Sequence, residues 1–234
     1  MYSVRIPVRQ SVESEAVLEQ LIAELWEAGT EGINEGPGYL EAFFASPEVA
    51  RRFGEPFLVA EVDWAAEFQA QWPALEVGER FFVVPPWNPD PTPEGRFRLV
   101  INPADQCGTG QHPCTQACLV ELERHLQPGD AVLDVGSGSG ILSIAAKMLG
   151  AGRVVACDID PNTAKTAPLL TSYGVPLYIG GVEAAVTGSF DVVVANISEA
   201  VLGPMLPELE RVGGTLILSG FQDDAGEWVA VVRK

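Results

Sequence analysis

Glycines at positions 136, 138 and 140 alternate with serines between two apolar segments, residues 131–135 and 141–149. Glycine lets the backbone adopt positive φ values and approach a ligand closely, and a helix that starts after such a loop offers unpaired N–H groups. The spacing is G-x-G-x-G, whereas the dinucleotide-binding fingerprint, G-x-G-x-x-G, requires a glycine where this chain has Ile141. We therefore expect Gly136 and Gly138 to hold a ligand other than a dinucleotide pyrophosphate. A tight strand-to-helix turn without a ligand is the alternative.

A carboxylate stands close to this loop, because Asp134 lies two positions before its first glycine. The arrangement is similar to that of methyltransferases, which commonly carry an acidic residue here, facing the ammonium group of their cofactor's methionine part. Glycine loop and carboxylate together favour a positively charged sulfonium cofactor, S-adenosyl-L-methionine, over a pyrophosphate. We expect Asp134 to be one of the cofactor-binding residues.

A second acidic residue, Asp158, follows the next apolar segment, residues 154–157. An acidic side chain at the tip of the second strand of a nucleotide-type fold is placed to accept hydrogen bonds from ribose hydroxyls, and we assign this role to Asp158. Asp160 and Pro161 are typical of the N-cap and the first residue of a helix. A turn or capping role is the alternative for Asp158, and the neighbouring glycine loop favours ribose binding.

Asn196 ends another apolar segment, residues 190–195. In amino-methyltransferases the residue at this place lies beside the transferable methyl group and can orient the nucleophile. Enzymes of this kind that act on planar bases or on glutamine often continue with Pro-Pro-aromatic, whereas Ile197 and Ser198 follow here. The sequence therefore does not indicate a clamp for a flat nucleobase. Simple turn chemistry is the alternative for Asn196.

The segment 107–115 has the glycines and hydroxyls of a loop that covers a ligand. His112 in this segment is interpreted as a structural histidine rather than a catalytic base. Any one of the nearby tryptophans is more often a core residue than a substrate platform; these are Trp64, Trp72 and Trp87.

The four cysteines contain no C-x-x-C pair and have no histidine or acidic partner at zinc-ligand spacing, so we expect reduced thiols and no metal. They are Cys107, Cys114, Cys118 and Cys157.

The order of apolar patterns predicts which elements position these residues. From about Thr115, helix and strand patterns alternate, and near-continuous apolar strands of this kind are typical of a parallel sheet covered on both faces. Ligands in such a sheet bind outside the carboxyl ends of the strands, where Gly136, Asp158 and Asn196 fall. The first sixty residues predict a small α+β module: a strand at 4–8, a helix at 14–28, a hairpin at 33–44 and a strand at 56–60.

These patterns predict an α/β protein with three parts. Residues 1–60 form a small α+β domain, residues 61–95 form a connector, and residues 96–234 form a Rossmann-like, doubly wound domain that carries the candidate cofactor-binding residues. Two strand-like segments, residues 80–84 and 97–101, flank a proline-rich stretch near the boundary.

The charge balance limits the partners. The chain has 32 acidic and 14 basic residues and a net charge of −18, so we expect neither direct nucleic-acid binding nor attraction to an anionic membrane. A basic partner would be attracted, although acidity that serves only solubility is equally compatible. No apolar run approaches the roughly 20 residues that span a bilayer, and the first nine residues lack the apolar core of a secretory signal, so we expect a cytoplasmic protein.

Taken in order, the motifs resemble those of the PrmA family, the bacterial methyltransferases of ribosomal protein L11. The matching stretches are Asp63-Trp64 through Trp87, Gly108-Thr-Gly-x-His112-x-x-Thr115, the segment 132–142, Gly150-Ala151, Asp158-Ile-Asp-Pro161, Val194-Ala-Asn-Ile197 and Leu218-Ser-Gly220. The resemblance implies a methyltransferase domain of the seven-stranded type and a small amino-terminal domain that holds the substrate protein. It also implies that Thr115, Gly136, Asp158 and Asn196 contact the cofactor, and that a basic ribosomal protein is the substrate.

Three departures from the family pattern stand out. Cys107 replaces the usual phenylalanine before Gly-Thr-Gly, and Cys114 replaces a threonine; the helix after Asp160 lacks the family's usual asparagines; and only fourteen residues follow Gly220, where relatives insert a further helix and strand. We expect residues 228–232 to fold back antiparallel beside residues 215–219 through a turn at 222–226, which gives a shortened C-terminal sheet edge.

The reaction that the resemblance implies is N-methylation of lysine or α-amino groups. A lysine must lose its proton before it can attack, and the Asn196 side-chain oxygen can orient the neutral amine while water takes the proton. Two alternatives remain open at this point. One is a methyltransferase that acts on another protein or a small amine, and the other is a cofactor-binding module without turnover.

Overall fold

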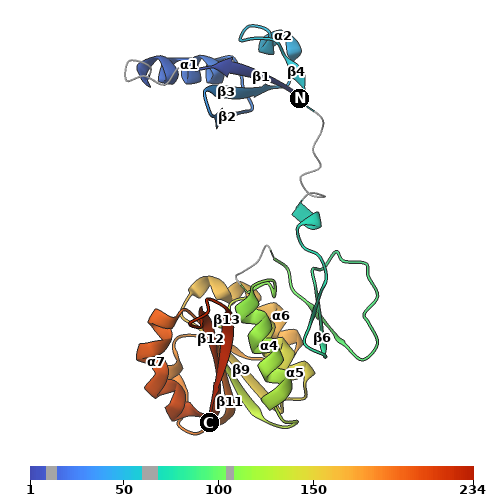
Figure 1. Cartoon of the computed structure of the whole chain (residues 1–234), viewed down its shortest axis with the longest axis vertical. Helices are drawn as coiled ribbons and strands as arrows, with labels where there is room; N and C mark the ends of the chain where they lie inside the picture. Colours follow the sequence, from blue (N-terminus) through green and yellow to red (C-terminus); the bar gives the residue numbers. More distant parts are fainter. Residues whose placement is uncertain (9–14, 60–67, 104–107) are drawn as a thin grey trace. The chain divides into compact units, whose positions relative to one another are not determined.

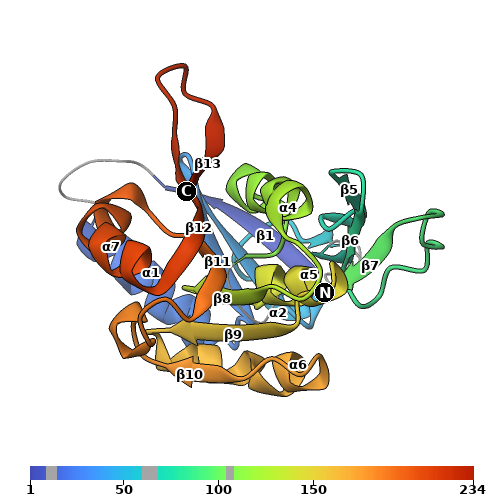
Figure 2. The ribbon, with the colours of Figure 1, turned by 90° about the horizontal axis from the view of Figure 1, so that it is seen from below.

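The chain divides into two units, residues 1–67 and residues 68–234. The computed structural model describes residues 1–8, 15–59, 68–103 and 108–234, and Figures 1 and 2 label its main helices and strands. Ser14, the first residue of the helix predicted at 14–28, lies outside the described residues, as do the motif residues Asp63, Trp64 and Cys107. The division into 1–60, 61–95 and 96–234 stays a prediction.

The smaller unit is a four-stranded sheet in the order β2-β3-β1-β4, with helices α1 and α2. The bounds are β1 Tyr2–Pro7, α1 Glu15–Glu27, β2 Gly32–Gly36, β3 Tyr39–Phe44, α2 Pro47–Ala50 and β4 Phe57–Leu58. Alternate residues of β3 are buried, and Leu40, Ala42 and Phe44 pack with Leu25 of α1 and with Val4. The strand, helix and hairpin predicted here are confirmed, whereas the short helix α2 was not predicted.

The larger unit has a three-stranded sheet near its start, formed by β5 Leu75–Val77, β6 Phe81–Val84 and β7 Phe97–Val100. The two strand-like segments of the sequence pair parallel as β6 and β7, with Phe81 opposite Phe97. Phe81 and Leu99 are fully buried and belong to the same apolar cluster as helix α4, Pro113–His125. This sheet is therefore part of the core that supports the main sheet.

The main sheet has six strands in the order β10-β9-β8-β11-β12-β13. The bounds are β8 Ala131–Val135, β9 Arg153–Asp158, β10 Leu177–Ile179, β11 Phe190–Asn196, β12 Gly213–Gln222 and β13 Trp228–Arg233. All neighbours pair parallel except β12 and β13, which pair antiparallel. The apolar strands β8 and β11 lie in the middle of this order because their side chains are buried on both faces.

Helices cover both faces of this sheet, as the alternating pattern predicted. Apolar residues of α4, α5 (Ile141–Met148) and α6 (Ala167–Ser172) form one cluster with the sheet, and those of α7 (Glu199–Val212) form another on the opposite face. Figure 1 shows α4 and α5 on one side of the strands and α7 on the other, and Figure 2 gives the same arrangement from below. The Rossmann-like α/β fold is confirmed.

The antiparallel tail is confirmed as well. Leu218 pairs with Val231, Ser219 with Ala230, and the register shifts between Ser219 and Phe221. Gly220 at this shift has φ +107°, and a Cβ there would lie 2.1 Å from the backbone oxygen of Ile197. Only glycine fits such a close approach of two backbones at positive φ.

No helix in the described part of the chain is both long enough and apolar enough to cross a membrane.

Candidate functional site

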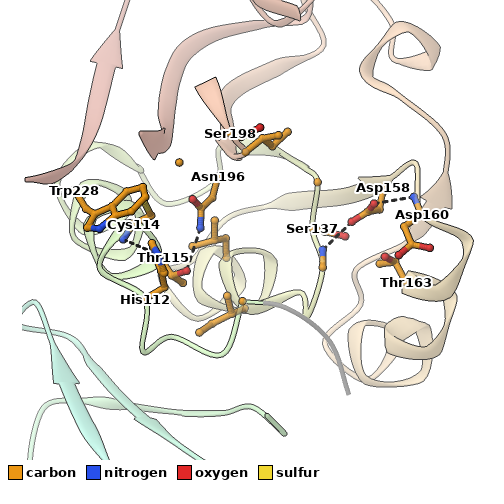
Figure 3. A pocket seen from close by; sticks show the side chains of 17 residues that line it. His112, Cys114, Thr115, Ser137, Asp158, Asp160, Thr163, Asn196, Ser198 and Trp228 are labelled. Atoms are coloured by element: carbon orange, nitrogen blue, oxygen red, sulfur yellow. Dashed lines mark hydrogen bonds between the residues drawn. The ribbon is translucent and has the colours of Figure 1, made fainter. Parts of the chain in front are cut away.

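A cavity of about 490 Å³ lies at the carboxyl ends of β8, β9 and β11. Its walls come from segments that are far apart in the sequence, and Figure 3 shows their side chains around it. The lining residues are Gly108, His112, Cys114, Thr115, Gly136, Ser137, Gly138, Ile141, Leu142, Asp158, Asp160, Thr163, Asn196, Ile197, Ser198, Gly220 and Trp228. This is the end of a parallel sheet where ligands bind. Five of the six residues predicted to bind or act on a cofactor line this one cavity.

The glycine loop after β8 is held against the end of β9. The N–H groups of Gly136 and Ser137 donate to the carbonyl oxygen of Cys157 at 2.8 and 3.1 Å. Gly136 has φ +71°, and a Cβ at this position would lie 3.0 Å from the side chain of Ile197. A side chain at this position would be strained by the positive φ and crowded by Ile197, so glycine leaves the backbone of the loop as part of the cavity wall.

Asp158 joins the loop to the tip of β9. Its Oδ2 accepts a hydrogen bond from the Gly138 N–H at 3.0 Å, and its Oδ1 accepts one from the Asp160 N–H at 2.9 Å. Asp158 thus has the turn role that is the alternative to ribose binding, and it also lines the cavity. Because an ionised carboxylate has about four acceptor positions, two backbone bonds leave capacity for ligand hydroxyls.

The helical turn after β9 starts as the sequence predicted. Asp160 is the N-cap of the 3₁₀ helix η2, Pro161–Thr166, and its side chain accepts a hydrogen bond from the Asn162 N–H. This cap fixes the direction of the chain directly after Asp158, and Thr163 of the same turn reaches the cavity.

Asp134 is the one predicted site residue that is not among the cavity-lining residues. It is only 1% exposed, and its Oδ2 accepts hydrogen bonds from the Ser143 N–H at 3.0 Å and from the Ser143 Oγ at 2.6 Å. Its Oδ1 is buried and has no hydrogen-bond partner within the described structure. Burial raises the pKa of Asp134 to about 6, although the hydrogen bonds from Ser143 lower it.

Asn196 and Thr115 meet at the other side of the cavity. The Asn196 Nδ2 donates to the Thr115 Oγ1 at 3.0 Å, as Figure 3 shows, and Thr115 is 1% exposed on the first turn of α4. With the amide assigned this way, the Oδ1 of Asn196 is its only acceptor, and among the described residues it receives no hydrogen bond. A free carbonyl oxygen beside a cavity can accept a hydrogen bond from an amine.

His112 has the structural role that the sequence indicated. It is the N-cap of α4, and its Nδ1 accepts a hydrogen bond from the Cys114 N–H at 3.3 Å. Its ring also meets the Trp228 ring edge-on, with centroids 4.7 Å apart at 73°.

Trp228 was not predicted to line the site. It reaches the cavity because β13 folds back beside β12, so its place depends on a strand pairing. The predicted antiparallel tail was the one signal that could have located this residue.

The cysteines are free thiols in the described residues, and Cys114, Cys118 and Cys157 are all buried. Burial raises the pKa of Cys157 to about 11 and raises that of Cys118 further, so both stay protonated near neutral pH. Within the described ranges, no group of three or more His, Cys, Asp or Glu side chains could hold a metal ion.

The chain was compared with protein families, curated proteins and solved structures, and one family recurs among the matches. The family model described as "Ribosomal protein L11 methyltransferase (PrmA)" matches residues 53–231. A ribosomal protein L11 methyltransferase of Ralstonia pickettii is 41% identical over 182 residues, which are 74% of this chain and 59% of that protein. One of Paraburkholderia xenovorans is 38% identical over 201 residues, 80% of this chain and 65% of that protein. The chain thus spans less than two thirds of the length of these relatives.

A solved structure agrees with the sequence matches. The crystal structure of ribosomal protein L11 methylase from Lactobacillus delbrueckii subsp. bulgaricus is similar with a TM-score of 0.57 and 30% identity. The similarity covers 64% of this chain and 80% of that chain.

Proposed function

The chain belongs to the PrmA family of ribosomal protein L11 methyltransferases, and on this premise we propose that it transfers methyl groups from S-adenosyl-L-methionine to amino groups of a ribosomal protein. The observation that carries this proposal is the single cavity at the ends of three parallel strands. It brings together a positive-φ glycine loop, the Asp158 carboxylate and the free amide oxygen of Asn196.

The residues of the cavity suit S-adenosyl-L-methionine, which supplies a methyl group on a positively charged sulfur. Gly136 and Gly138 would lie against it, Thr115 would border it, and Asp158 would accept hydrogen bonds from its ribose hydroxyls. The buried, unpartnered oxygen of Asp134 supports a positively charged ligand. An uncompensated buried carboxylate is costly, and a cationic group nearby, directly or through a water, reduces that cost.

The nucleophile would be a neutral amine, and Asn196 is the residue proposed to orient it. A lysine has a solution pKa near 10.4, so an amine that enters the cavity must give up a proton before its lone pair can attack. The Asn196 Oδ1 would accept a hydrogen bond from the amine while Thr115 holds the amide in place, and water would take the proton. The chain thus contributes mainly by holding the amine in line and by excluding water.

The acceptor is proposed to be a basic ribosomal protein, since the relatives are named for ribosomal protein L11 and this chain has a net charge of −18. An acidic surface attracts a lysine-rich partner and repels nucleic acid and anionic membranes, so neither is proposed as a partner. The smaller unit is proposed as the part that recognises the substrate, and the cytoplasm, where ribosomes are assembled, as the location.

The test is a transfer assay with labelled S-adenosyl-L-methionine and purified ribosomal protein L11, for the full chain and for Asn196→Ala. We expect label on the ribosomal protein and a loss of about 100-fold in kcat for the variant, because a displaced amine reacts slowly. Undiminished activity in Asn196→Ala would remove Asn196 from the mechanism. Label on a small amine or another protein, and none on L11, would contradict the proposed acceptor. Binding of cofactor with no transfer to any acceptor would indicate a module without turnover.

A further inference from the structure

The two edges of the main sheet differ in how they are protected. An edge strand presents unpaired N–H and C=O groups, and proteins protect such edges with short strands, prolines or charged residues. The edge strand β10 has three residues, Leu177–Ile179, so little of its backbone is open. The opposite edge strand, β13, has six residues, Trp228–Arg233, and none of its first five is a proline or charged.

The side chains of β13 are only partly covered. Trp228 is 38% exposed and Val231 is 42% exposed, whereas residues 216–219 of the neighbouring strand β12 are all buried. Figure 2 shows the β12–β13 hairpin at the end of the sheet, where it projects from the other strands. No strand in the described ranges pairs with the outer edge of β13. A long, apolar and β-branched edge of this kind is a template for another strand.

The charges at the ends of β13 indicate which strand fits. Glu227 precedes the apolar residues, and Arg233 and Lys234 follow them. We propose that the outer edge of β13 pairs antiparallel with β13 of a second copy of this chain around a two-fold axis. With Ala230 opposite its own copy, Val229 lies opposite Val231, and Glu227 lies opposite Arg233 at both ends. Parallel pairing in register would place like charges opposite each other, which destabilises a strand pair.

The net negative charge of the chain opposes formation of this dimer. Each copy carries −18, so the copies repel each other, and pairing along six residues buries less area than a standard interface. The association is therefore weak, and added salt strengthens it, because salt screens the net repulsion more than it weakens two local ion pairs. This interface does not depend on the proposed catalytic activity, and its tests read the mass of the assembly.

The first test is sedimentation equilibrium of the full chain. The expected result is a monomer at about 1 µM and a dimer at about 100 µM at physiological salt, as for a weak two-fold interface. Val231→Lys places a charge in the middle of the pair and keeps the chain monomeric. Val201→Lys is the matched control, because Val201 is 44% exposed on α7 and the change is the same. A monomer at all concentrations overturns the proposal, as does a dimer that survives Val231→Lys.

The second test uses charge exchange between copies. Glu227→Lys alone and Arg233→Glu alone each place like charges at both ends and prevent the dimer. An equimolar mixture of the two variants restores it, because Lys then lies opposite Glu at one end and the native pair remains at the other. Arg233 also lies 3.5 Å from Glu210, so the melting temperature of each variant is compared with that of the native chain to exclude misfolding. Failure of the mixture to form a heterodimer overturns the antiparallel register.

Hydrogen exchange distinguishes two ways in which the outer edge of β13 could be covered: by a second copy of the chain or by another part of the same chain. The expected result is protection of β13 amides that increases with protein concentration in the native chain but not in Val231→Lys. Protection that does not change with concentration would show that no second copy pairs with this edge and would overturn the proposal.

Discussion

The Asn196 Nδ2 donates to the Thr115 Oγ1 at 3.0 Å, although 81 positions separate the two residues in the sequence. Thr115 is buried at the start of α4 and Asn196 ends β11, so this bond ties a helix to the end of the strand beside the cavity. It leaves the amide with its oxygen as the group available to a ligand. The bond therefore sets the direction of the one neutral acceptor side chain proposed to act on the substrate.

Removal of this bond tests the proposed role of Asn196. In Thr115→Val the amide loses its fixed orientation, and we expect kcat to fall about 10- to 100-fold. The free energy of unfolding should fall by about 1 kcal/mol, since one partly buried hydrogen bond is lost. Thr115→Ser keeps the hydroxyl and should stay within about threefold of the native kcat. Equal activities of the valine and serine variants would contradict the proposed role.

Asp158 is expected to control cofactor affinity. Asp158→Ala removes the acceptor of the Gly138 N–H and the proposed acceptor of the ribose hydroxyls, so the Kd for S-adenosyl-L-methionine should rise about 10- to 100-fold. Asp191→Ala is the control, because Asp191 also accepts a backbone N–H, that of Ala131 at 2.8 Å, but at the other end of the strands. Calorimetric titration measures both values. A similar loss of affinity in the two variants would mean that only stability was affected.

Asp134 is expected to give the native state a pH dependence. Because burial raises its pKa from 3.8 to about 6, the folded state binds this proton more tightly than the unfolded chain does. The stabilisation from this proton is present below pH about 4 and is lost as the pH rises to about 6. Asp134→Asn does not titrate, so its free energy of unfolding should rise relative to the native chain over this interval and stay level above it.

Urea unfolding at stepped pH gives this difference directly, since other titrating groups are common to both proteins. A difference that does not change with pH would show that the carboxyl of Asp134 is not the titrating group.

Gly220 is expected to be intolerant of any side chain. An alanine there has φ +107° and a Cβ only 2.1 Å from the Ile197 oxygen, so we expect a loss of about 3 kcal/mol or more in the free energy of unfolding. Gly226→Ala in the same hairpin is the control. Its φ of +82° is also positive, but nothing lies within 4 Å of the added Cβ, so a loss of about 1 kcal/mol is expected. Thermal unfolding of both variants measures the two losses of stability. Equal losses would show that the close contact with Ile197 is not the cause.

Much of this fold could be predicted because its signals are local. The apolar strands next to glycines gave the parallel sheet, and Asp160 followed by Pro161 gave the start of a helical turn. The tail strand was predicted from its apolar run and the turn before it. Short elements such as α2 and β5, with four and three residues, are too short to show a period and were not predicted.

The contacts that complete the cavity could not be predicted in the same way. The bond from Asn196 to Thr115 and the contact of Trp228 with His112 depend on the order of strands in the sheet. Asp158 accepts hydrogen bonds from two backbone N–H groups of adjoining turns, and these bonds depend on how the glycine loop packs against the end of β9. Spacing along a chain gives candidates for a site, whereas strand order decides which candidates meet.

The proposed function depends most on the binding of S-adenosyl-L-methionine by the glycine loop and Asp158. Calorimetric titration of the full chain with that ligand tests this binding most directly. The predicted result is saturable binding of one molecule per chain, together with a rise in melting temperature that increases with ligand concentration. Absence of heat and an unchanged melting temperature at millimolar ligand would contradict it.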